Sequence, residues 1–323
     1  MQIRLSNPRG FCAGVRMAID IVDEILDAMD ENEKLYVYHE IVHNRHVVDR
    51  LKERGAIFVE DISEVPQSSV VVFSAHGVSP AIKEQAKSRS LISIDATCPL
   101  VTKVHAEAIR YAKRGWQIIL IGHRNHQEVV GTYGEAPDSI QIVETPEDIQ
   151  YLHIIDPSKL IYLTQTTLSI DDADIIINAL KEAFPEINAP PNDDICYATT
   201  NRQTAVRDEA PDADLVLVVG SQNSSNSLRL TEISKAVGTP SYLVDDVSMI
   251  NPHWLEGVDN ILITAGASAP ERLVVEIIEH LTSSFNGELI EESVVDEGMF
   301  FSMPNSLRNY LEGKDITVEG EVQ

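Results

Sequence analysis

Three cysteines in equivalent settings constrain the fold of this chain more than any other feature. Cys12, Cys98 and Cys196 are its only cysteines, and they lie 86 and 98 residues apart. Each one stands where a strand-like run gives way to a helical pattern of apolar residues. Two more apolar runs follow each cysteine, and both end in polar residues. Because the pattern occurs three times, we predict three similar α/β units.

Polar clusters mark the ends of six predicted strands. They occupy residues 39–44, 74–77, 122–128, 164–167, 220–226 and 264–268. Counted from its cysteine, the first cluster of each unit lies 31, 28 and 30 residues away, and the second lies 64, 68 and 72 residues away. Alternating apolar runs and helical patterns indicate parallel sheets, which bind ligands at the carboxyl ends of their strands. If the units pack around a pseudo-threefold axis, the three thiols meet at its centre among these polar groups.

We expect the units to form three small α/β domains. The first comprises residues 1–97 and is joined by a C-terminal tail of residues 284–323, the second comprises residues 98–193, and the third comprises residues 194–283. Within the tail, residues 298–304 are predicted to be extended and to pack on another domain. The acidic end from residue 314 is predicted to be disordered.

The charge balance excludes several classes of partner. The chain has 25 Lys and Arg against 51 Asp and Glu, a net charge of −26, which disfavours nucleic acid and anionic membranes because their phosphates are repelled. No apolar run approaches the roughly 20 residues that span a bilayer, and the N-terminus lacks the pattern of a signal peptide. An odd number of widely spaced cysteines fits a reducing compartment. We therefore expect a cytoplasmic protein, and we expect it to be a monomer or weak dimer.

Three thiols at helix N-termini can serve three kinds of chemistry. The helix dipole and the unpaired N–H groups favour the thiolate, which attacks carbon or binds metal. One possibility is zinc held by three cysteines and a histidine, in a zinc-stabilised binding module for phosphorylated metabolites without redox activity. A second is a 4Fe-4S cluster whose three cysteine ligands leave one iron open as a Lewis acid. A third is a transferase in which a single thiolate is the nucleophile.

The polar clusters have the composition of an anion-binding site. Imidazole, hydroxyl and amide donors at helix N-termini suit a diphosphate where lysine and arginine are not prominent. Glu128 is a candidate proton donor, and Thr166 can orient it or a substrate hydroxyl. The candidate anion ligands are His43, His76, His126, Ser224, Ser225, Asn226 and Ser268.

Eight sequence motifs coincide with the cysteines and the polar clusters. They are Asn7-Pro-Arg-Gly-Phe-Cys-Ala-Gly-Val15, His39-Glu-Ile-Val-His-Asn44, Phe73-Ser-Ala-His-Gly-Val78, Asp95-Ala-Thr-Cys-Pro-Leu-Val-Thr-Lys-Val-His105, Thr164-Gln-Thr-Thr167, Asp194-Ile-Cys-Tyr-Ala-Thr-Thr-Asn-Arg-Gln203, Ser221-Gln-Asn-Ser-Ser-Asn-Ser227 and Thr264-Ala-Gly-Ala-Ser-Ala-Pro270. With these motifs the chain resembles the 4-hydroxy-3-methylbut-2-enyl diphosphate reductases, the IspH/LytB family. The resemblance runs from about residue 1 to residue 310.

The resemblance implies an iron–sulfur reductase with three α/β domains arranged as a cloverleaf. Such an enzyme removes the allylic hydroxyl of 4-hydroxy-3-methylbut-2-enyl diphosphate with two electrons and protons. The products are isopentenyl and dimethylallyl diphosphate, in the last step of the non-mevalonate (methylerythritol phosphate) isoprenoid pathway. The resemblance also implies that Cys12, Cys98 and Cys196 hold a central 4Fe-4S cluster with an open iron for the substrate hydroxyl.

The same resemblance implies roles for the polar residues. Glu128 would relay the proton, Thr166 would hold the substrate hydroxyl, and His126 would belong to both the catalytic and the substrate-binding residues. The other candidate anion ligands named above would bind the diphosphate. Two places depart from the family's pattern, since Gly14-Val15 is followed directly by an arginine and the usual His-Pro-Glu-Val-Glu-Gly is here His-Gln-Glu-Val-Val-Gly.

A small electron carrier of the ferredoxin or flavodoxin type is the protein partner that the resemblance implies. Such carriers are acidic, and this chain is acidic as well. We therefore predict a local basic patch for the carrier, with Arg9, Arg45, Lys103 and Arg202 as its candidate members.

Overall fold

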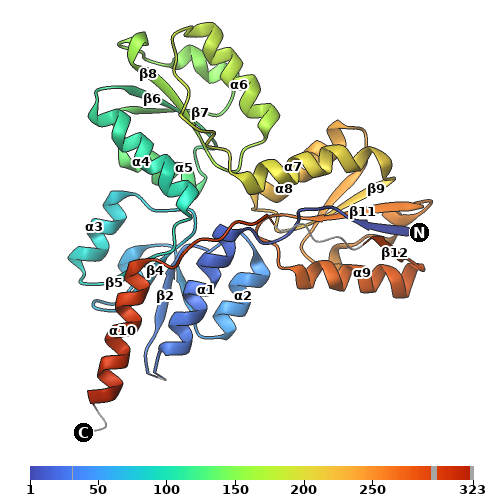
Figure 1. The fold of residues 1–323 in the computed structure, drawn as a ribbon, viewed down its shortest axis with the longest axis horizontal. Helices are drawn as coiled ribbons and strands as arrows, with labels where there is room; N and C mark the ends of the chain where they lie inside the picture. Colours follow the sequence, from blue (N-terminus) through green and yellow to red (C-terminus); the bar gives the residue numbers. More distant parts are fainter. Residues whose placement is uncertain (31, 292–296, 321–323) are drawn as a thin grey trace.

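Three parallel sheets lie around a common centre in the computed structural model of this chain (Figure 1). The structure describes residues 1–30, 32–291 and 297–320. Within these residues every pairing between named strands is parallel. The prediction of three α/β units with parallel sheets is confirmed, and each sheet with its helices forms one lobe.

The first lobe is built on a four-stranded sheet. Its strands lie in the order β3 (Ile57–Val59), β2 (Leu35–Tyr38), β4 (Val70–Phe73) and β5 (Ile92–Asp95). Its helices are α1 (Ala13–Ala28), α2 (Arg45–Glu53) and α3 (Pro80–Ser88). Successive side chains of a strand point to opposite faces, so Val70 and Val72 join a core with α1 and α2, while Val71 and Phe73 join one with α3. Both faces of β4 are therefore covered.

The second lobe repeats this plan with three strands. They lie in the order β7 (Ile140–Val143), β6 (Gln117–Ile121) and β8 (Leu160–Thr164). Its helices are α4 (Pro99–Lys113), α5 (Gln127–Glu135) and α6 (Ile170–Ala183). Ile118 and Leu120 of β6 face the core cluster of α4 and α5, and Ile119 and Ile121 face that of α6.

The third lobe contains a five-stranded sheet. Its strands lie in the order β10 (Ser241–Val244), β9 (Leu215–Val219), β11 (Asn260–Ala265), β1 (Gln2–Leu5) and β12 (Glu288–Glu291). Its helices are α7 (Tyr197–Glu209), α8 (Ser225–Ala236) and α9 (Glu271–Phe285). One core cluster joins the sheet to α7 and α8, and another joins it to α9.

The two ends of the chain lie differently from the expected domains, which place residues 1–97 and the tail together in the first domain. β1 pairs with β11 and β12, so that Ile3 lies opposite both Ile261 and Leu289 in the third sheet. Ile3 is fully buried there among the apolar side chains of that lobe. The chain passes to the first lobe after β1, since α1 packs on β2 and β4. The other boundaries, near residues 98 and 194, stay a prediction.

The tail returns from the third lobe to the first (Figure 1). As predicted for residues 298–304, Phe301 and Met303 pack against a core outside the third lobe, that of α1 and β2. Helix α10 (Asn305–Gly320) follows, and its Leu307 is fully buried in the same core. The prediction of disorder from residue 314 is wrong for the helical residues, because α10 continues past Lys314, which pairs with Glu33. Residues 321–323 lie outside the described part.

Short connections join these elements. Four of those described contain 3-10 helices, which are η1 (Ile62–Glu64), η2 (Pro146–Tyr151), η3 (Pro157–Lys159), η4 (Ala210–Asp212), η5 (Val247–Met249) and η6 (Pro252–Leu255). Among the described residues, no helix combines the length and the apolar character needed to cross a bilayer.

Candidate active site

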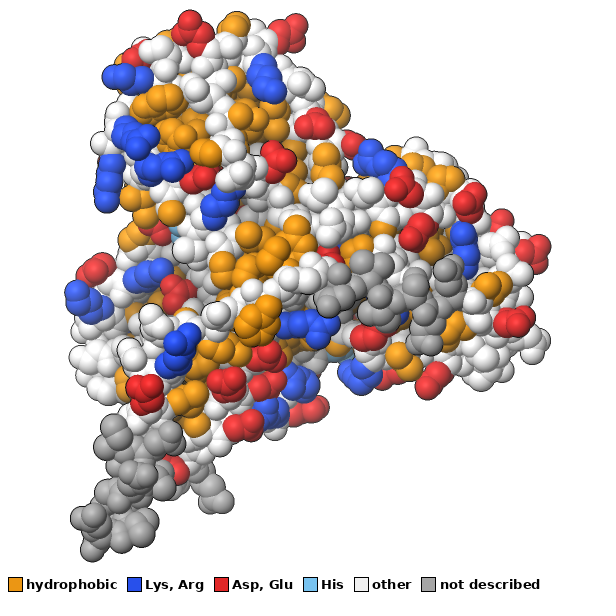
Figure 2. Space-filling model, viewed as in Figure 1, with side chains coloured by type: hydrophobic (Ala, Val, Ile, Leu, Met, Phe, Trp, Pro, Cys, Tyr) orange, Lys and Arg blue, Asp and Glu red, His pale blue; other side chains and the backbone are white. Residues whose placement is uncertain are grey.

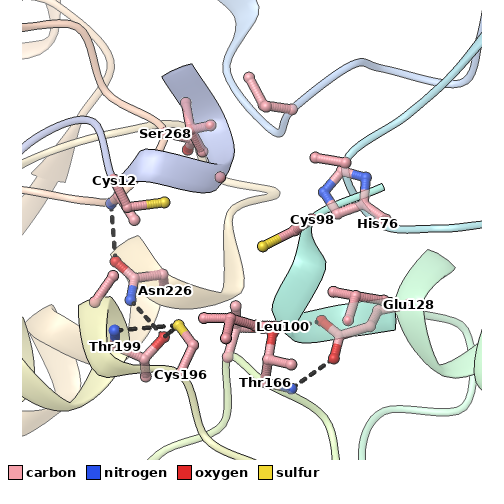
Figure 3. Close-up of a pocket in the computed structure, with 18 of the residues that line it drawn as sticks. Cys12, His76, Cys98, Leu100, Glu128, Thr166, Cys196, Thr199, Asn226 and Ser268 are labelled. Atoms are coloured by element: carbon pink, nitrogen blue, oxygen red, sulfur yellow. Dashed lines mark hydrogen bonds between the residues drawn. The ribbon is translucent and has the colours of Figure 1, made fainter. Parts of the chain in front are cut away.

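A cavity lies where the three lobes meet, and strand ends and helix starts from all three lobes form its wall (Figure 3). All twelve predicted site residues line this cavity. They are Cys12, Cys98, Cys196, His43, His76, His126, Glu128, Thr166, Ser224, Ser225, Asn226 and Ser268. The structure therefore brings the predicted residues together, and their membership of a functional site stays a prediction.

Each cysteine is the N-cap residue of a helix. Cys12 precedes α1, Cys98 precedes α4 and Cys196 precedes α7. A strand comes before the first two in sequence, whereas the segment before Cys196 is an irregular loop rather than the predicted strand. Backbone bonds hold these positions from other elements: Cys12 N–H donates to Ala267 O at 3.1 Å, and Cys196 N–H donates to Thr166 O at 2.9 Å. The threefold pattern thus brings three thiols to one place.

The three thiols are buried deeply enough to oppose ionisation. Burial raises the pKa of Cys98 to about 12 and that of Cys196 to about 11, and it also raises the pKa of Cys12. The charge of a neighbouring thiol adds to the rise for Cys98 and Cys196, which places the sulfurs within electrostatic reach of one another. Bonds from the N–H groups at the helix starts lower these pKa values, as expected, but burial outweighs them.

These three thiols fit a bound cationic centre. A metal ion deprotonates the thiols that coordinate it, which offsets the cost that burial imposes on each thiolate. In the described ranges, no three Cys, His, Asp or Glu side chains are arranged to hold a single metal ion. Three cysteines can be the protein ligands of a zinc ion that a fourth ligand completes, or of an iron–sulfur cluster.

Gly14 leaves room for the thiol of Cys98. A methyl group at Gly14 would lie 2.6 Å from Cys98 Sγ, which is too close for any real contact. We expect Gly14→Ala to displace Cys98 and to weaken metal retention about 10-fold, as changes beside metal ligands do. Iron per chain after anaerobic reconstitution measures this effect. Gly313→Ala, in α10 with open space around the added methyl, is the matched control, and equal iron contents for the two variants would contradict the prediction.

Three histidines from two lobes form one wall of the cavity. The rings of His43 and His76 stack with centroids 4.0 Å apart, and His126 meets them edge-on at 5.3 and 5.8 Å. Burial lowers the pKa of His126 to about 3 and that of His76 well below its ordinary value, and neighbouring His43 adds to both shifts. Since Nδ1 of His126 accepts the N–H of Glu128 at 3.2 Å, its proton sits on Nε2. The lowered pKa values keep His76 and His126 neutral as long as no anion lies beside them.

Hydroxyl and amide groups of the third lobe form the facing wall. Ser224 is the N-cap of α8, with its Oγ accepting the N–H of Ser227 at 3.3 Å. Ser268 Oγ donates to His43 O at 2.8 Å, so it joins this wall to the first lobe. Asn226 is held on both sides, since its Oδ1 accepts Ala267 N–H at 3.0 Å and its Nδ2 donates to Thr199 at 3.3 Å. The start of α8 therefore presents unpaired N–H groups and hydroxyls toward the cavity.

Glu128 and Thr166 form a buried pair in the cavity wall, and a bond between them is drawn in Figure 3. Thr166 donates twice to the carboxyl group, from its N–H to Oε1 at 2.6 Å and from its hydroxyl to Oε2 at 3.0 Å. Burial raises the pKa of Glu128 to about 7, although these two bonds act in the opposite direction. The carboxyl group is therefore poised to give up or take a proton near neutral pH.

Three further residues that line the cavity were not among the predicted site residues. Thr199 donates its N–H to Cys196 Sγ at 3.4 Å, and its position three residues after an N-cap is the signal that reveals such a bond. Tyr197 accepts the first N–H of α1, from Ala13, at 3.1 Å. Phe301 of the tail also lines the cavity, and no local pattern in the sequence predicts this.

The predicted basic patch is wrong for Arg9 and Arg202, whose side chains are buried. Arg9 pairs with Glu271 at 2.6 Å, and the exposed Arg45 pairs with Asp246 at 3.0 Å. Lys103 and Arg202 bond to main-chain carbonyls of distant loops and to Asp194 and Glu297. On the face shown in Figure 2, basic side chains instead gather over the second lobe, where the last turn of α4 contains two cations.

Comparisons with known proteins give the family. The sequence profile of the family described as LytB protein matches residues 3–282, which is most of the chain. The chain belongs to the LytB protein family. The resemblance seen in the sequence motifs is thereby confirmed, and the match includes all three cysteines of this LytB chain.

Relatives and solved structures agree with this membership over nearly the whole length. A 4-hydroxy-3-methylbut-2-enyl diphosphate reductase of Idiomarina loihiensis is 52% identical over 316 residues, which cover 97% of this chain and 100% of the relative. The enzyme of the same name from Chromohalobacter salexigens is 54% identical over 313 residues, 95% of this chain and 98% of the relative. The structure of the E-1-hydroxy-2-methyl-but-2-enyl-4-diphosphate reductase from Plasmodium falciparum matches with a TM-score of 0.92 at 41% identity, over 97% of this chain and 99% of that one.

Gln127 stands where the family's pattern has a proline, and the structure shows which helical position it occupies. His126 is the N-cap of α5, and Gln127 takes the first helical position. Proline is also favoured at that position because its missing N–H is not needed there. Gln127 therefore preserves the helix start that places Glu128 against Thr166.

Proposed function

We propose that this chain is a 4-hydroxy-3-methylbut-2-enyl diphosphate reductase, the terminal enzyme of the non-mevalonate pathway. Two electrons and two protons replace the allylic C–O bond by a C–H bond and release water, so that the products are isopentenyl and dimethylallyl diphosphate. The observation that carries this proposal is the convergence of three N-cap thiols, a buried proton donor and a donor-rich wall on one cavity.

Cys12, Cys98 and Cys196 are the residues that hold the 4Fe-4S cluster in this proposal. The fit rests on their burial, their mutual electrostatic reach and the space that Gly14 leaves at Cys98. When bound, such a cluster supplies electrons and one iron without a protein ligand, which acts as a Lewis acid toward the substrate hydroxyl. Thr199 bonds to Cys196 through both N–H and hydroxyl, and these bonds favour the thiolate that a cluster needs.

The diphosphate binds between the histidines and the start of α8. His43, His76 and His126 present imidazole groups from one side, and Ser224, Ser225, Asn226 and Ser268 present hydroxyl and amide groups from the other. This arrangement needs no lysine or arginine, since N–H groups at a helix start already attract phosphate. The diphosphate end is thus anchored in the cavity that also contains the cysteines.

Glu128 delivers a proton to the reacting end of the substrate, with Thr166 as the group that orients it. In the ionised form Thr166 O–H donates to Oε2, so its hydroxyl proton is occupied. Once Glu128 is protonated, the carboxylic acid can donate to Thr166 Oγ1, and the threonine proton becomes free to bond a substrate oxygen. The pair therefore couples the protonation of Glu128 to the binding of the substrate hydroxyl.

Diphosphate binding is expected to take up protons. Burial and mutual repulsion hold His76 and His126 neutral, with the pKa of His126 at about 3, and a bound polyanion favours their charged forms. Titration calorimetry with inorganic diphosphate at pH 7, in buffers of different ionisation enthalpy, should show a net uptake of about one proton. His76→Asn should reduce the uptake, whereas His153→Asn, at a site that does not line the cavity, should not. A binding enthalpy independent of buffer would contradict this prediction.

A small electron carrier of the ferredoxin or flavodoxin type supplies the electrons in this proposal, since the chain itself provides no source of reducing equivalents for repeated turnover. Three unpaired thiols fit a reducing compartment, so we place the enzyme in the cytoplasm.

Turnover under anaerobic conditions tests the proposed function. The reconstituted chain is mixed with 4-hydroxy-3-methylbut-2-enyl diphosphate and a one-electron chemical reductant, and the products are separated by chromatography. Formation of isopentenyl and dimethylallyl diphosphate is the expected result. Retention of the substrate by a chain that carries a full complement of iron would overturn the proposal.

A further inference from the structure

Two cations occupy related positions close to the cysteines, and the proposed chemistry does not use them. Lys103 lies on α4, five residues after Cys98, and Arg202 lies on α7, six residues after Cys196. Each is thus within the first two turns of a helix that a cavity cysteine caps. Each donates hydrogen bonds to main-chain carbonyls a few residues before another cysteine in the sequence.

Lys103 holds the loop in front of Cys196. Its Nζ donates to Asn192 O at 2.8 Å, to Asp193 O at 2.9 Å and to Asp194 Oδ1 at 3.0 Å. The side chain of Asp194 is fully buried, and its second oxygen accepts the N–H of Thr164 at 3.0 Å. Lys103 therefore connects the helix that starts at Cys98 with the loop that ends at Cys196.

Arg202 holds the loop in front of Cys12 in the same manner. Its Nε and one terminal nitrogen donate to Gly10 O at 3.2 and 2.8 Å, and its other terminal nitrogen donates to Ala198 O at 2.9 Å. Glu297 of the tail pairs with the guanidinium at 3.0 Å. Arg202 is fully buried, so water does not compete for these charge-assisted bonds. The helix that starts at Cys196 is thereby fixed to the loop that ends at Cys12.

The remaining junction, between α1 and Cys98, is made by direct contact. Gly14 on the first turn of α1 lies so close to Cys98 that an added methyl would meet its sulfur at 2.6 Å. Each of the three helices that a cysteine caps thus contacts the segment that contains another of the cysteines. Lys103 and Arg202 make two of these contacts, and Gly14 makes the third. The three contacts close a ring around the cavity.

We propose that Lys103 and Arg202 are positioning residues that fix the three cysteines relative to one another and so determine how firmly the metal centre is retained. The inference rests on the proposed cluster site. Main-chain carbonyls are the principal acceptors of both cations, so what is held is the path of the backbone that leads into each cysteine. Side-chain pairs on the surface contribute little to such positioning, because they are solvated and mobile.

Loss of the cluster to a chelator tests this proposal. Lys103→Met keeps the apolar stem but removes the bonds to residues 192–194, and the visible absorbance should decay about 10-fold faster than in the unaltered chain. Lys83→Met is the matched control, because Lys83 is a cation near the same cysteine whose bond, at 2.8 Å, goes to the partly exposed side chain of Asp95 and not to the main chain. Its decay rate should equal that of the unaltered chain. For Arg202, the variant Arg202→Lys retains the charge but cannot reach Gly10 and Glu297 together, and we expect it to lose the cluster faster too.

A second measurement separates positioning from a general loss of stability. The unfolding midpoint of iron-free Lys103→Met should fall, because the buried Asp194 loses its cation. At a temperature where both iron-free variants are folded, the cluster of Lys103→Met should still decay faster than that of Lys83→Met. If Lys103→Met folds and loses the cluster at the rate of the unaltered chain, the positioning role is wrong. If the unaltered chain takes up no iron and sulfide at all, the proposed cluster itself is wrong, which is a different result from equal decay rates.

Discussion

Replacing Glu128 with glutamine is expected to lower kcat by about 10²- to 10⁴-fold, the usual contribution of a positioned general acid. Glutamine can keep both contacts with Thr166, since its oxygen can accept the N–H and its amide can donate to the hydroxyl. What it cannot do is release a proton. Iron content, visible absorbance and KM should therefore change little while turnover falls.

The pH dependence of turnover is a second test of the role of Glu128. Burial raises the pKa of Glu128 to about 7, so the protonated donor is present below that pH and is lost as the pH rises through it. Turnover of the unaltered chain should decline above pH 7, and the small residual turnover of Glu128→Gln should lack this decline. Glu135→Gln is the control, because Glu135 is a buried carboxylate on the same helix that pairs with His105 and does not line the cavity. A kcat for Glu128→Gln equal to that of the control would remove Glu128 from the mechanism.

Removing any one cysteine is expected to abolish turnover, by about 10³-fold or more, because a metal centre supplies several kcal/mol of stabilisation to the reacting groups. Cys12→Ala, Cys98→Ala and Cys196→Ala should each lose iron and acid-labile sulfide as well as activity. The three effects should be similar, since the three residues occupy equivalent N-cap positions in one cavity.

The pattern among the three variants distinguishes the alternatives. A thiolate nucleophile would make one cysteine essential and leave the other two dispensable. Ser88→Ala, at an exposed position at the end of α3, serves as the control for handling and reconstitution. If two of the three cysteine variants retain full turnover, the proposed cluster is contradicted, and a transferase with one thiolate nucleophile becomes the better hypothesis.

That the candidate residues line one cavity was predictable from the sequence, because each marks a local event. A cysteine before a helical pattern and a polar cluster after an apolar run are signals within about ten residues, and the C-terminal ends of parallel strands meet at one edge of a sheet. His76, Thr166 and Ser268 were found in this way and all line the cavity. The threefold spacing then placed the clusters of different lobes together.

What the sequence missed depends on contacts between distant segments. The pairing of β1 with β11 joins residues about 260 positions apart, and no local pattern in Ile3 to Leu5 distinguishes one parallel sheet from another. Lys103 and Arg202 were predicted to belong to a local basic patch for an acidic electron carrier. Their acceptors are main-chain carbonyls of other loops, 89 and 192 residues away, which composition does not reveal.

The ionisation state of the three thiols also depends on burial, which the sequence position does not give. A helix N-terminus lowers a thiol's pKa when water can reach the site, and position in the sequence gives the N-terminus but not the burial. In the folded chain burial dominates, so the pKa of Cys98 rises to about 12. The position of a cysteine in the sequence therefore does not give the ionisation state of its thiol.

Iron and acid-labile sulfide per chain, measured on anaerobically purified protein together with its visible spectrum, test the central claim most directly. The account predicts about four of each, with the broad brown absorption of a 4Fe-4S cluster. Zinc in place of iron, with no sulfide even after reconstitution, would contradict it and would leave a zinc-stabilised binding module for phosphorylated metabolites.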